Sequence, residues 1–399
     1  MIVRRRLAAL PRSADLFDMK EKGDIFRDSP ARAVHIVRCA DYADALVPAF
    51  ARLLDESALL EPSAVAGRRV LVKPNLLTDS TPEEAVTTHP AFLRLVIRHL
   101  KSAGARVTVG DSPACAANIR AVLERTGVGA VCVEEGVPFV SFEQEGVRAC
   151  AVDGFEFTLA GPVAEADLIV SLPKVKSHSL TKLTAAVKNL YGAVPGYDKT
   201  TLHRRHPKPD DFGRLIQAIW RVLPPTVSLV DGVIGMEGQG PANGRPVPLG
   251  FLAASADPFA LDIALCGILH LKPSSIPYLK GVVDQHVPEL TGDTVAVASF
   301  EVPVGSYLLS LVPAGLMRVA ARVLWVRPQI DAARCVNCGR CLKACPVNAL
   351  VRPEVRGIPI LRRRACVGCA CCHEVCPQGA IRMVQSPMLR LAHALQGIS

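Results

Sequence analysis

Two cysteine-rich runs near the C-terminus constrain this 399-residue chain more than any other feature. They read Cys335-Val-Asn-Cys-Gly-Arg-Cys-Leu-Lys-Ala-Cys-Pro346 and Cys366-Val-Gly-Cys-Ala-Cys-Cys-His-Glu-Val-Cys-Pro377. Each run contains the pattern C-x2-C-x2-C-x3-C-P, whose spacing wraps three thiolates around one [4Fe–4S] cubane and sends the fourth to the other cluster. The sequence therefore predicts a small C-terminal α+β ferredoxin-like domain with two [4Fe–4S] clusters.

The predicted ligand sets cross between the two runs. One cluster is expected to take Cys335, Cys338, Cys341 and Cys376, and the other Cys366, Cys369, Cys372 and Cys345. A zinc or disulfide framework explains the runs less well, because zinc modules need two C-x2-C pairs and have no use for a third cysteine or a following proline. Cys371 is a ninth cysteine in these runs. It is expected to be a spectator beside the cluster, and its replacement of Cys372 in a shifted arrangement stays open.

The remaining cysteines and the N-terminus favour the cytoplasm. Five of the 14 cysteines are scattered, which is typical of buried thiols in a reducing compartment. Residues 1–10 carry three arginines, and no apolar signal core follows them. The apolar stretches 251–271 and 307–326 contain charged residues, so no transmembrane segment is predicted. The second stretch has helical spacing, and a peripheral contact of it with a membrane surface stays open.

The cluster region is strongly basic. Residues 331–385 carry nine Lys or Arg against three Asp or Glu, in a chain of net charge +9. This charge either compensates the anionic clusters or forms a docking face for an acidic electron donor such as ferredoxin or flavodoxin. Nucleic-acid binding is not expected, because the charge is concentrated at the clusters and aromatic residues make up only 5% of the chain.

The first 300 residues alternate strand and helix patterns. Strands are predicted at 69–73, 106–110, 168–172 and 227–230, and helices at 91–102, 116–125, 181–189, 212–223 and 258–269. This alternation predicts an α/β fold with a mostly parallel sheet and flanking helices. The predicted division is an N-terminal extension 1–32, an α/β domain 33–300, an amphipathic helical linker 301–328, the cluster domain 329–385 and a tail 386–399.

Polar side chains follow four of the predicted strands, and ligands of parallel sheets gather at that edge. The residues 174–208 add a basic run, which suits a carboxylate or a phosphate, although a solvated basic face is the alternative. The predicted substrate-binding residues are Lys73, Asn75, Asp111, Ser112, Lys174, Lys182, Thr184 and Asn189. The predicted catalytic residues are His178, Lys176, Lys188 and Asp231. The glycine-rich stretch 231–244 is expected to be either a loop covering the substrate or a plain surface loop.

Several of these motifs resemble one family. They are Lys73-Pro-Asn75, Gly110-Asp-Ser112, Leu172-Pro-Lys-Val-Lys-Ser-His178, Ala186-Val-Lys-Asn-Leu-Tyr-Gly192, Asp231-Gly232, Glu237-Gly-Gln-Gly-Pro241 and Ala256-Asp-Pro258. Together they are similar to the domain of unknown function 362 family over about residues 33–300. The resemblance implies iron–sulfur proteins that often carry a C-terminal two-cluster module. Residues 174–196 are also distantly similar to the histidine- and lysine-containing loops of lactate racemase-like proteins, which bind a hydroxy acid.

The function expected from the sequence is that of an iron–sulfur oxidoreductase. Electrons from the two clusters would pass to an anionic small molecule or cofactor in the α/β cleft, where Lys and Asn side chains bind it and His178 or a lysine supplies a proton. Two other classes stay open. One is an electron-transfer subunit for a partner enzyme, and the other is a non-redox isomerase or ligase with structural or sensing clusters.

Overall fold

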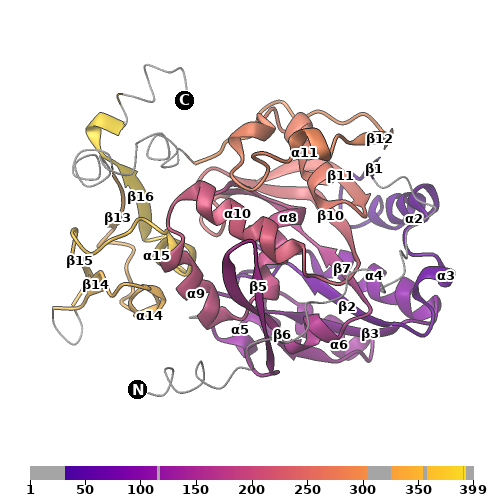
Figure 1. The fold of residues 1–399 in the computed structure, drawn as a ribbon, viewed down its shortest axis with the longest axis horizontal. Helices are drawn as coiled ribbons and strands as arrows, with labels where there is room; N and C mark the ends of the chain where they lie inside the picture. The colour runs from indigo at the N-terminus through magenta and orange to yellow at the C-terminus, as the bar shows by residue number, and fades with distance from the viewer. Residues whose placement is uncertain (1–31, 115–116, 304–324, 354–356, 390, 392–399) are drawn as a thin grey trace.

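The fold is seen in a computed structural model that describes residues 32–114, 117–303, 325–353, 357–389 and 391. The predicted N-terminal extension, helical linker and C-terminal tail therefore lie almost entirely outside the described residues, as does the start of the helix predicted at 116–125. The chain forms a large lobe up to residue 303 and a small lobe from residue 325, drawn in yellow and orange at the left of Figure 1.

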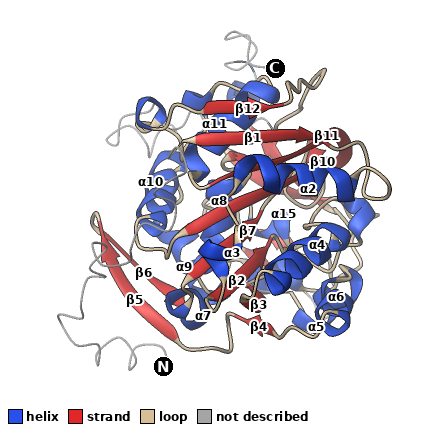
Figure 2. Ribbon diagram, turned by 90° about the vertical axis from the view of Figure 1, so that its right-hand side faces the viewer, coloured by secondary structure: helices blue, strands red, loops and turns tan. Residues whose placement is uncertain are grey.

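A ten-stranded sheet spans the large lobe, and eight of its strands follow the order β12-β1-β11-β10-β7-β2-β3-β4 (Figure 2). Strand pairing is parallel from β10 to β4 and between β1 and β12, and it is antiparallel on both sides of β11. The strands are β1 Ala33–Arg38, β2 Arg69–Pro74, β3 Arg106–Asp111, β4 Phe139–Ser141, β7 Leu168–Leu172, β10 Thr226–Glu237, β11 Arg245–Ser255 and β12 Glu289–Gly292. The predicted fold class, a mostly parallel sheet with flanking helices, is confirmed.

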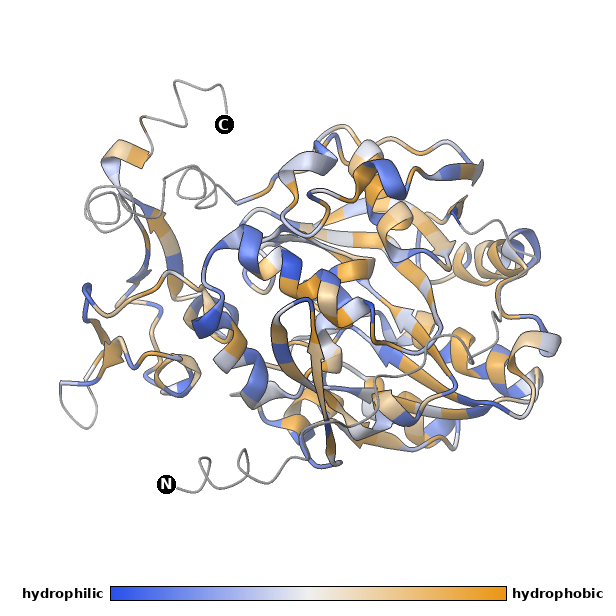
Figure 3. Cartoon of the chain, viewed as in Figure 1, coloured by the Kyte–Doolittle hydropathy of each residue, from blue (hydrophilic) through white to orange (hydrophobic). Residues whose placement is uncertain are grey.

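Helices cover both faces of this sheet because its strands are apolar on both faces. Val70 and Val72 of β2 pack into one buried cluster and Leu71 into the other, and Ile169 and Val170 of β7 divide in the same way. The face of Val70 is covered by α2 Leu46–Ser57, α3 Pro62–Val65, α4 Pro90–Ser102, α5 Ile119–Arg125 and α6 Val128–Glu134. The other face is covered by α7 Gly161–Glu165, α8 Ala186–Leu190, α9 Gly196–Arg205, α10 Pro209–Trp220 and α11 Pro258–Ile268. Figure 3 shows the resulting apolar interior.

The segment after β7 differs from the prediction of a helix at 181–189. It forms β8 Lys174–His178, which pairs with β10, then β9 Lys182–Thr184 and only afterwards the short helix α8. The ring of His178 explains the turn, because its Nδ1 accepts the backbone N–H groups of Leu180 and Thr181 at 3.0 and 3.3 Å. Lys182 has a left-handed backbone (φ 63°), which no helix interior accepts.

Helix α8 begins at Ala186, five residues after the predicted start at 181, where a residue of another helix caps it. Both carboxylate oxygens of Asp262 in α11 accept helix N–H groups, from Ala186 at 2.7 Å and from Val187 at 3.0 Å. This cap comes from 76 residues away, so no local sequence signal carries it.

The glycine-rich stretch 231–244 is neither a covering loop nor a plain surface loop over most of its length. Strand β10 continues to Glu237 and pairs with β11, and a turn follows. Ser177 of β8 holds that turn, because its Oγ donates to the carbonyl of Gly238 at 3.0 Å and accepts the N–H of Gly240 at 3.2 Å. A Cβ at position 240 would collide with the backbone of Ser177, so only glycine fits this contact.

Shorter elements complete the large lobe. They are the hairpin of β5 Val147–Val152 and β6 Phe155–Ala160, and the 3-10 turns η2 Pro82–Glu84, η3 Tyr191–Ala193, η4 Pro273–Ser275 and η5 Val283–Gln285. Of these, η3 directly follows α8 and brings Tyr191 and Gly192 to the edge of the sheet where β2 and β3 end.

The small lobe is the predicted α+β module. Strand β13 Val326–Ile330 pairs with β16 Ile381–Gln385, and β14 Leu350–Val351 pairs with β15 Ile360–Leu361, both antiparallel. Each cysteine run supplies one short helix, α14 Arg340–Ala344 and α15 Cys371–Glu374. Helix α15 lies against the large lobe beside α9 (Figure 1).

Candidate functional site

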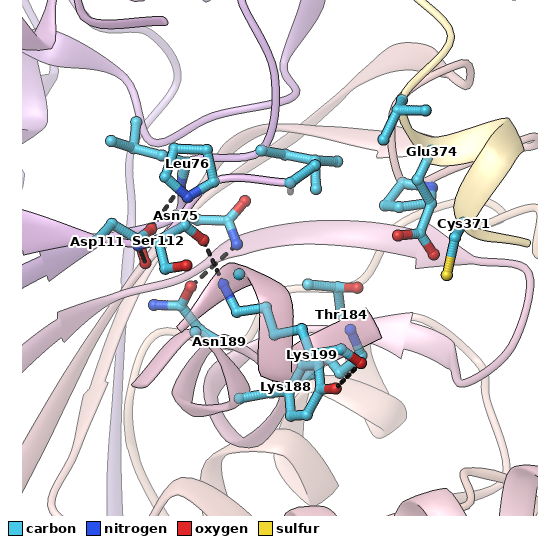
Figure 4. A pocket seen from close by; sticks show the side chains of 18 of the residues that line it. Asn75, Leu76, Asp111, Ser112, Thr184, Lys188, Asn189, Lys199, Cys371 and Glu374 are labelled. Carbon is cyan, nitrogen blue, oxygen red and sulfur yellow. Dashed lines mark hydrogen bonds between the residues drawn. The ribbon is translucent and has the colours of Figure 1, made fainter. Parts of the chain in front are cut away.

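A pocket lies between the two lobes at the carboxyl ends of β2, β3 and β8; we call it the inter-lobe pocket. Its empty volume, which includes space open to solvent, is about 770 Å³. Nine of the residues predicted as substrate-binding or catalytic line it, namely Lys73, Asn75, Asp111, Ser112, Lys176, His178, Thr184, Lys188 and Asn189. Figure 4 labels Asn75, Asp111, Ser112, Thr184, Lys188 and Asn189 among these, together with Lys199 from α9 and with Cys371 and Glu374 from the small lobe.

The floor of the pocket is a buried ion pair between Lys73 and Asp111. The Nζ of Lys73 lies 2.6 Å from Oδ1 of Asp111, and both side chains are about 2% exposed. Asp111 also accepts the backbone N–H groups of Leu76 and Ser112, both at 2.8 Å. A Cβ at position 192 would lie 2.6 Å from Cε of Lys73, so Gly192 is required for this arrangement. The pair is electrically neutral and fixes the strand ends.

An amide chain orients Asn75. The Nδ2 of Asn189 donates to Oγ of Ser171 at 2.9 Å and to the carbonyl of Lys73 at 3.4 Å, so its Oδ1 faces the pocket side. That Oδ1 accepts from Nδ2 of Asn75 at 2.9 Å. The remaining oxygen of Asn75 is buried and has no hydrogen-bond partner among the described residues.

Three lysines make the pocket electropositive. Lys176 donates to the carbonyl of Val86 at 2.7 Å, and Lys199 donates to the carbonyl of Ser112. Among the described residues, Lys188 has no hydrogen bond or ion pair, and its Nζ lies 5.4 Å from the ring centre of Tyr191. Burial lowers the pKa of Lys176 to about 7, with the charge of Lys188 adding to the effect. Burial also lowers the pKa of Lys199 to about 8 and that of Lys188 below its usual value. An anion placed among them would favour their charged forms.

His178 has a defined tautomer. Its Nδ1 accepts two backbone N–H groups, so the proton of the neutral ring sits on Nε2. Nε2 lies 3.4 Å from Oε1 of Glu374, which comes from α15 in the small lobe. Burial, and then the nearby charge of Lys188, holds the pKa of His178 well below its usual value, so the ring stays neutral near pH 7. His178 is therefore a hydrogen-bond donor toward the pocket.

His203 of α9 has the opposite tautomer. Its Nδ1 lies 2.9 Å from the carbonyl oxygen of Lys199 and 3.1 Å from the hydroxyl oxygen of Tyr191. Because the carbonyl oxygen only accepts, the shorter contact places the proton on Nδ1. The hydroxyl of Tyr191 donates to the same carbonyl at 3.0 Å. The Nε2 of His203 is thus an acceptor, and it is buried with no hydrogen-bond partner among the described residues. Burial lowers the pKa of this ring, which keeps it neutral.

Three of the predicted site residues do not line the inter-lobe pocket. Lys174 and Asp231 pair with each other at 3.0 Å and are at most about 1% exposed. Asp231 also accepts from the hydroxyl of Tyr42 at 2.6 Å and from the N–H of His89 at 2.9 Å. Every polar atom of this group is used inside the protein, which is typical of a structural cluster. Lys182, the third residue, lies at the left-handed turn into β9.

The small lobe forms the opposite wall of the pocket. Cys371 and Glu374 stand three residues apart on α15, so they share one face of it, and both line the pocket. His373 ties this helix to the large lobe, because its two ring nitrogens lie 2.6 Å from the carbonyl oxygen of Ile381 and 3.0 Å from that of Gln239. Asn243 adds a hydrogen bond to the carbonyl of His373 at 2.8 Å.

The structure brings the predicted cluster ligands together as two sets, each around its own cavity. One cavity is lined by Cys335, Cys338, Cys341 and Cys376, and the other by Cys345, Cys366, Cys369 and Cys372. Cys371 lines neither of these cavities.

These cavities fit cubane clusters. Within the described residues, no group of three or more His, Cys, Asp or Glu is arranged to hold a single metal ion. In both sets the cysteine before proline accepts a backbone N–H at its sulfur, from Ala349 to Cys345 at 3.1 Å and from Ala380 to Cys376 at 3.2 Å. Such bonds stabilise the thiolate form that iron–sulfur clusters bind.

Sequence reasoning did not select several residues of the pocket. Lys199 belongs to the basic run, but nothing in that run distinguishes it from the exposed members; His203 is, with His178, one of the histidines of the run that could donate a proton, although a lone histidine is more often structural. Glu374 and Cys371 lie in the second cysteine run. Their one unusual feature in the sequence is that the equivalent positions of the first run hold Lys343 and Arg340.

Two family matches cover the two lobes. Residues 70–267 match a family described as a domain of unknown function (DUF362), and residues 328–383 match one described as a 4Fe-4S dicluster domain. A relative, a thylakoid-associated protein of Synechocystis sp., is 35% identical over 249 residues, which are 62% of this chain and 77% of the relative.

Two solved structures align with part of the chain. The lactate racemase apoprotein from Thermoanaerobacterium thermosaccharolyticum aligns at 13% identity and a TM-score of 0.39, over 61% of this chain and 57% of its own. A protein from Thermotoga maritima aligns at 14% identity and a TM-score of 0.31, over 45% and 49%. The chain thus spans little more than half of the first and about half of the second. Within the described residues, no helix has the length and apolar composition that crossing a membrane requires.

Proposed function

The chain belongs to the family defined by the domain of unknown function DUF362, and from that premise we propose that it is an iron–sulfur oxidoreductase. Two [4Fe–4S] clusters, held by the two cysteine sets, supply single electrons to an anionic substrate or cofactor in the inter-lobe pocket. The 4Fe-4S dicluster domain supports electron transfer as the coarse function, and the shared pocket supports the finer one.

One observation carries the proposal. The pocket is lined on one side by the cations of the large lobe and on the other by Cys371, which is the direct chain neighbour of the cluster ligand Cys372. A ligand among the lysines therefore lies next to the helical turn that holds the second cysteine set. A pocket meant only for structural contact between lobes would not need three lysines with one carboxylate.

The large lobe binds the anion. Lys188 has no competing ion pair among the described residues, and Lys199 and Lys176 each have donors left after one hydrogen bond to a carbonyl. Among the described residues that line the pocket, Glu374 is the only carboxylate besides Asp111, which is neutralised by Lys73. The unpaired charge of the lining is therefore positive, and it attracts an anion.

Lys176 is the better proton donor of the pocket. Its pKa of about 7 places both of its protonation states within reach at neutral pH. His178 is neutral, and its Nε2–H is better suited to hold a substrate oxygen or Glu374 than to release a proton. In this proposal Lys176 supplies the proton that accompanies reduction, and His178 positions the acceptor.

Electron uptake is proposed at the first cysteine set. Cys338 is exposed, Val336 beside it is 61% exposed, and Arg334 is exposed nearby. An exposed apolar residue beside a cation suits an acidic donor such as ferredoxin or flavodoxin. A cytoplasmic location, with a peripheral membrane contact as the alternative, remains a proposal; the Synechocystis relative is described as thylakoid-associated.

The test begins with anaerobic purification and iron and sulfide analysis, where about eight irons per chain are expected. EPR spectra of the dithionite-reduced protein are then recorded with and without small phosphates and carboxylates. A ligand-dependent change that is lost in Lys188→Met, and kept in the exposed Lys272→Met control, supports a substrate site beside a cluster. Full iron content with no spectral response to any anion, together with unimpaired electron flux to a partner, would support the electron-carrier alternative.

A further inference from the structure

Four buried polar atoms in the wall of the inter-lobe pocket have no hydrogen-bond partner among the described residues. They are Oδ1 of Asn75, Oγ1 of Thr184, Nε2 of His203 and Oε1 of Glu374. Such atoms are rare in folded proteins, because a buried polar group without a partner has lost its hydrogen bonds to water and gained none. Four of them around one pocket, from both lobes, point to a ligand that pairs with them.

Two of the four are acceptors whose roles are fixed by their surroundings. Asn75 gives its amide N–H to Asn189, whose own amide orientation is set by the carbonyl of Lys73, so Asn75 presents oxygen to the pocket. His203 gives its Nδ1–H to the carbonyl of Lys199, so it presents a lone pair on Nε2. His203 is only 6% exposed, which leaves its Nε2 little access to bulk solvent.

The third acceptor is the carboxylate oxygen of Glu374. It faces Nε2 of the neutral His178 at 3.4 Å, too far for a good hydrogen bond. An anion alone does not satisfy these three acceptors, since a phosphate or carboxylate oxygen at neutral pH mostly accepts hydrogen bonds. The ligand must bring its own O–H or N–H groups.

The lysines demand the opposite character in the same ligand. Lys188 offers an ammonium group with no hydrogen bond among the described residues, and Lys199 and Lys176 offer further donors. A neutral polyol would leave this positive charge buried without compensation.

We propose that the inter-lobe pocket takes a small hydroxylated oxyanion, with its phosphate or carboxylate at Lys188 and its hydroxyl groups at Asn75 and His203. This inference uses the same pocket as the proposed function and names its ligand class. Simple oxyanions and unsubstituted acids fit less well, because they satisfy the lysines and leave the acceptors unpaired.

The experiment is isothermal titration calorimetry of the anaerobic, cluster-containing protein with matched ligand pairs. Glycerol 3-phosphate is compared with propyl phosphate, and glycerate with propionate; each pair shares charge and carbon number and differs by two hydroxyl groups. The hydroxylated member is expected to bind at least about tenfold more tightly in one pair or both, since its two hydroxyl groups form hydrogen bonds that the other member lacks. Which pair shows the larger preference distinguishes a phosphate from a carboxylate site.

Variants assign the preference to the named acceptors. His203→Phe keeps the ring packed against Tyr191 and removes Nε2, so the preference should fall below about threefold while propyl phosphate binding changes by less than about twofold. His206→Phe is the matched control on the same segment; His206 packs against Phe155 outside the pocket lining, and the preference should persist. Asn75→Leu is a second variant in case His203→Phe fails to fold.

Equal affinity within both pairs would overturn this inference and leave the anion site of the proposed function intact. So would a preference that survives in both His203→Phe and Asn75→Leu. If no member of either pair binds and none changes the cluster EPR signals, the proposed anion site itself fails.

Discussion

The two cysteine runs have one backbone design and two different roles. Asn337 and Gly339 of the first run have left-handed backbones, and so do their equivalents Gly368 and Ala370 in the second. In both runs the last cysteine accepts an N–H from the residue four positions later. The side chains that leave this shared frame are different, and they decide what each run contacts.

Both runs contact the large lobe, but the second run supplies the polar side chains of the pocket wall. Arg340 of the first run makes two contacts with Asp79 of the large lobe, at 2.5 and 3.0 Å. The equivalent residue of the second run is Cys371, and the equivalent of Lys343 is Glu374; both line the inter-lobe pocket. The first copy of the duplicated cluster motif thus contributes an ion pair with the large lobe, and the second contributes the polar wall of a ligand site, which gives the proposed electron path a direction.

Replacing one cysteine of each set tests whether electrons reach the pocket from the second set. Cys372→Ser and Cys341→Ser replace equivalent ligands, and each should lower the iron content from about eight to about four per chain if the rest of the module survives. Only Cys372→Ser should abolish the ligand-dependent EPR change, because the second set adjoins the pocket. Iron analysis and EPR of both variants check this; equal loss of the ligand response in both would erase the distinction between the runs.

A change of pH should alter anion binding through Lys176. With a pKa of about 7, Lys176 is mostly charged at pH 6 and mostly neutral at pH 8. Anion affinity is therefore expected to fall by up to about tenfold over this interval, because only the charged form attracts the ligand. Calorimetric titrations at several pH values measure the slope. In Lys176→Met the part of the slope near pH 7 should vanish, and a wild-type slope in that variant would contradict the assignment.

Glu374 of the second run and Lys343 of the first occupy equivalent positions and carry opposite charges, so their substitution separates the roles of the two runs. At pH 6, Glu374→Gln removes a negative charge facing Lys188, and anion affinity should rise by roughly three- to tenfold. Lys343→Gln changes the equivalent position of the first run, which does not line the pocket, and the affinity should stay within about twofold. Propyl phosphate serves as the probe for both variants. If Lys343→Gln raised the affinity for propyl phosphate by the same factor, the effect of Glu374→Gln could not be assigned to the position of Glu374 in the pocket wall.

Loss of the ion pair between Arg340 and Asp79 should lower the thermal stability only slightly. Arg340→Gln removes the ion pair with Asp79, whose side chains are 23% and 12% exposed, and about 1 kcal/mol of docking energy is at stake. The thermal loss of cluster absorbance should move down by a few degrees, with unchanged iron content before heating. Arg364, which is exposed and lies two residues before Cys366, provides the control: Arg364→Gln should leave the thermal transition unchanged.

The features of this protein that depend on local chemistry could be predicted from its sequence. The cysteine spacing predicts the ligand sets from covalent reach alone, and apolar runs such as Arg69–Pro74 and Leu168–Leu172 predict the sheet. The family resemblance, based on motifs at the strand ends, is confirmed. Nine of the 12 candidate cleft residues line one pocket because parallel strands end at one edge.

The features that could not be predicted depend on contacts between residues far apart in the sequence. The helix predicted at 181–189 starts late because His178 caps a turn and Asp262 caps the helix, and neither contact is visible in the local pattern. Lys174 and Asp231 look like site residues at a strand end, yet Tyr42 and His89 use up their polar atoms. Glu374 reaches the pocket only through the docking of the small lobe.

The position of Cys371 also bears on how the protein matures. Within four residues the second run offers three thiols, at positions 369, 371 and 372, whereas its cavity uses only the first and the last. In the folded module the short helix places the middle thiol in the wall of the inter-lobe pocket, so an incoming cluster would meet only the four predicted ligands. In an unfolded segment nothing makes that choice. We therefore expect faithful assembly to require that the polypeptide fold before the iron is delivered.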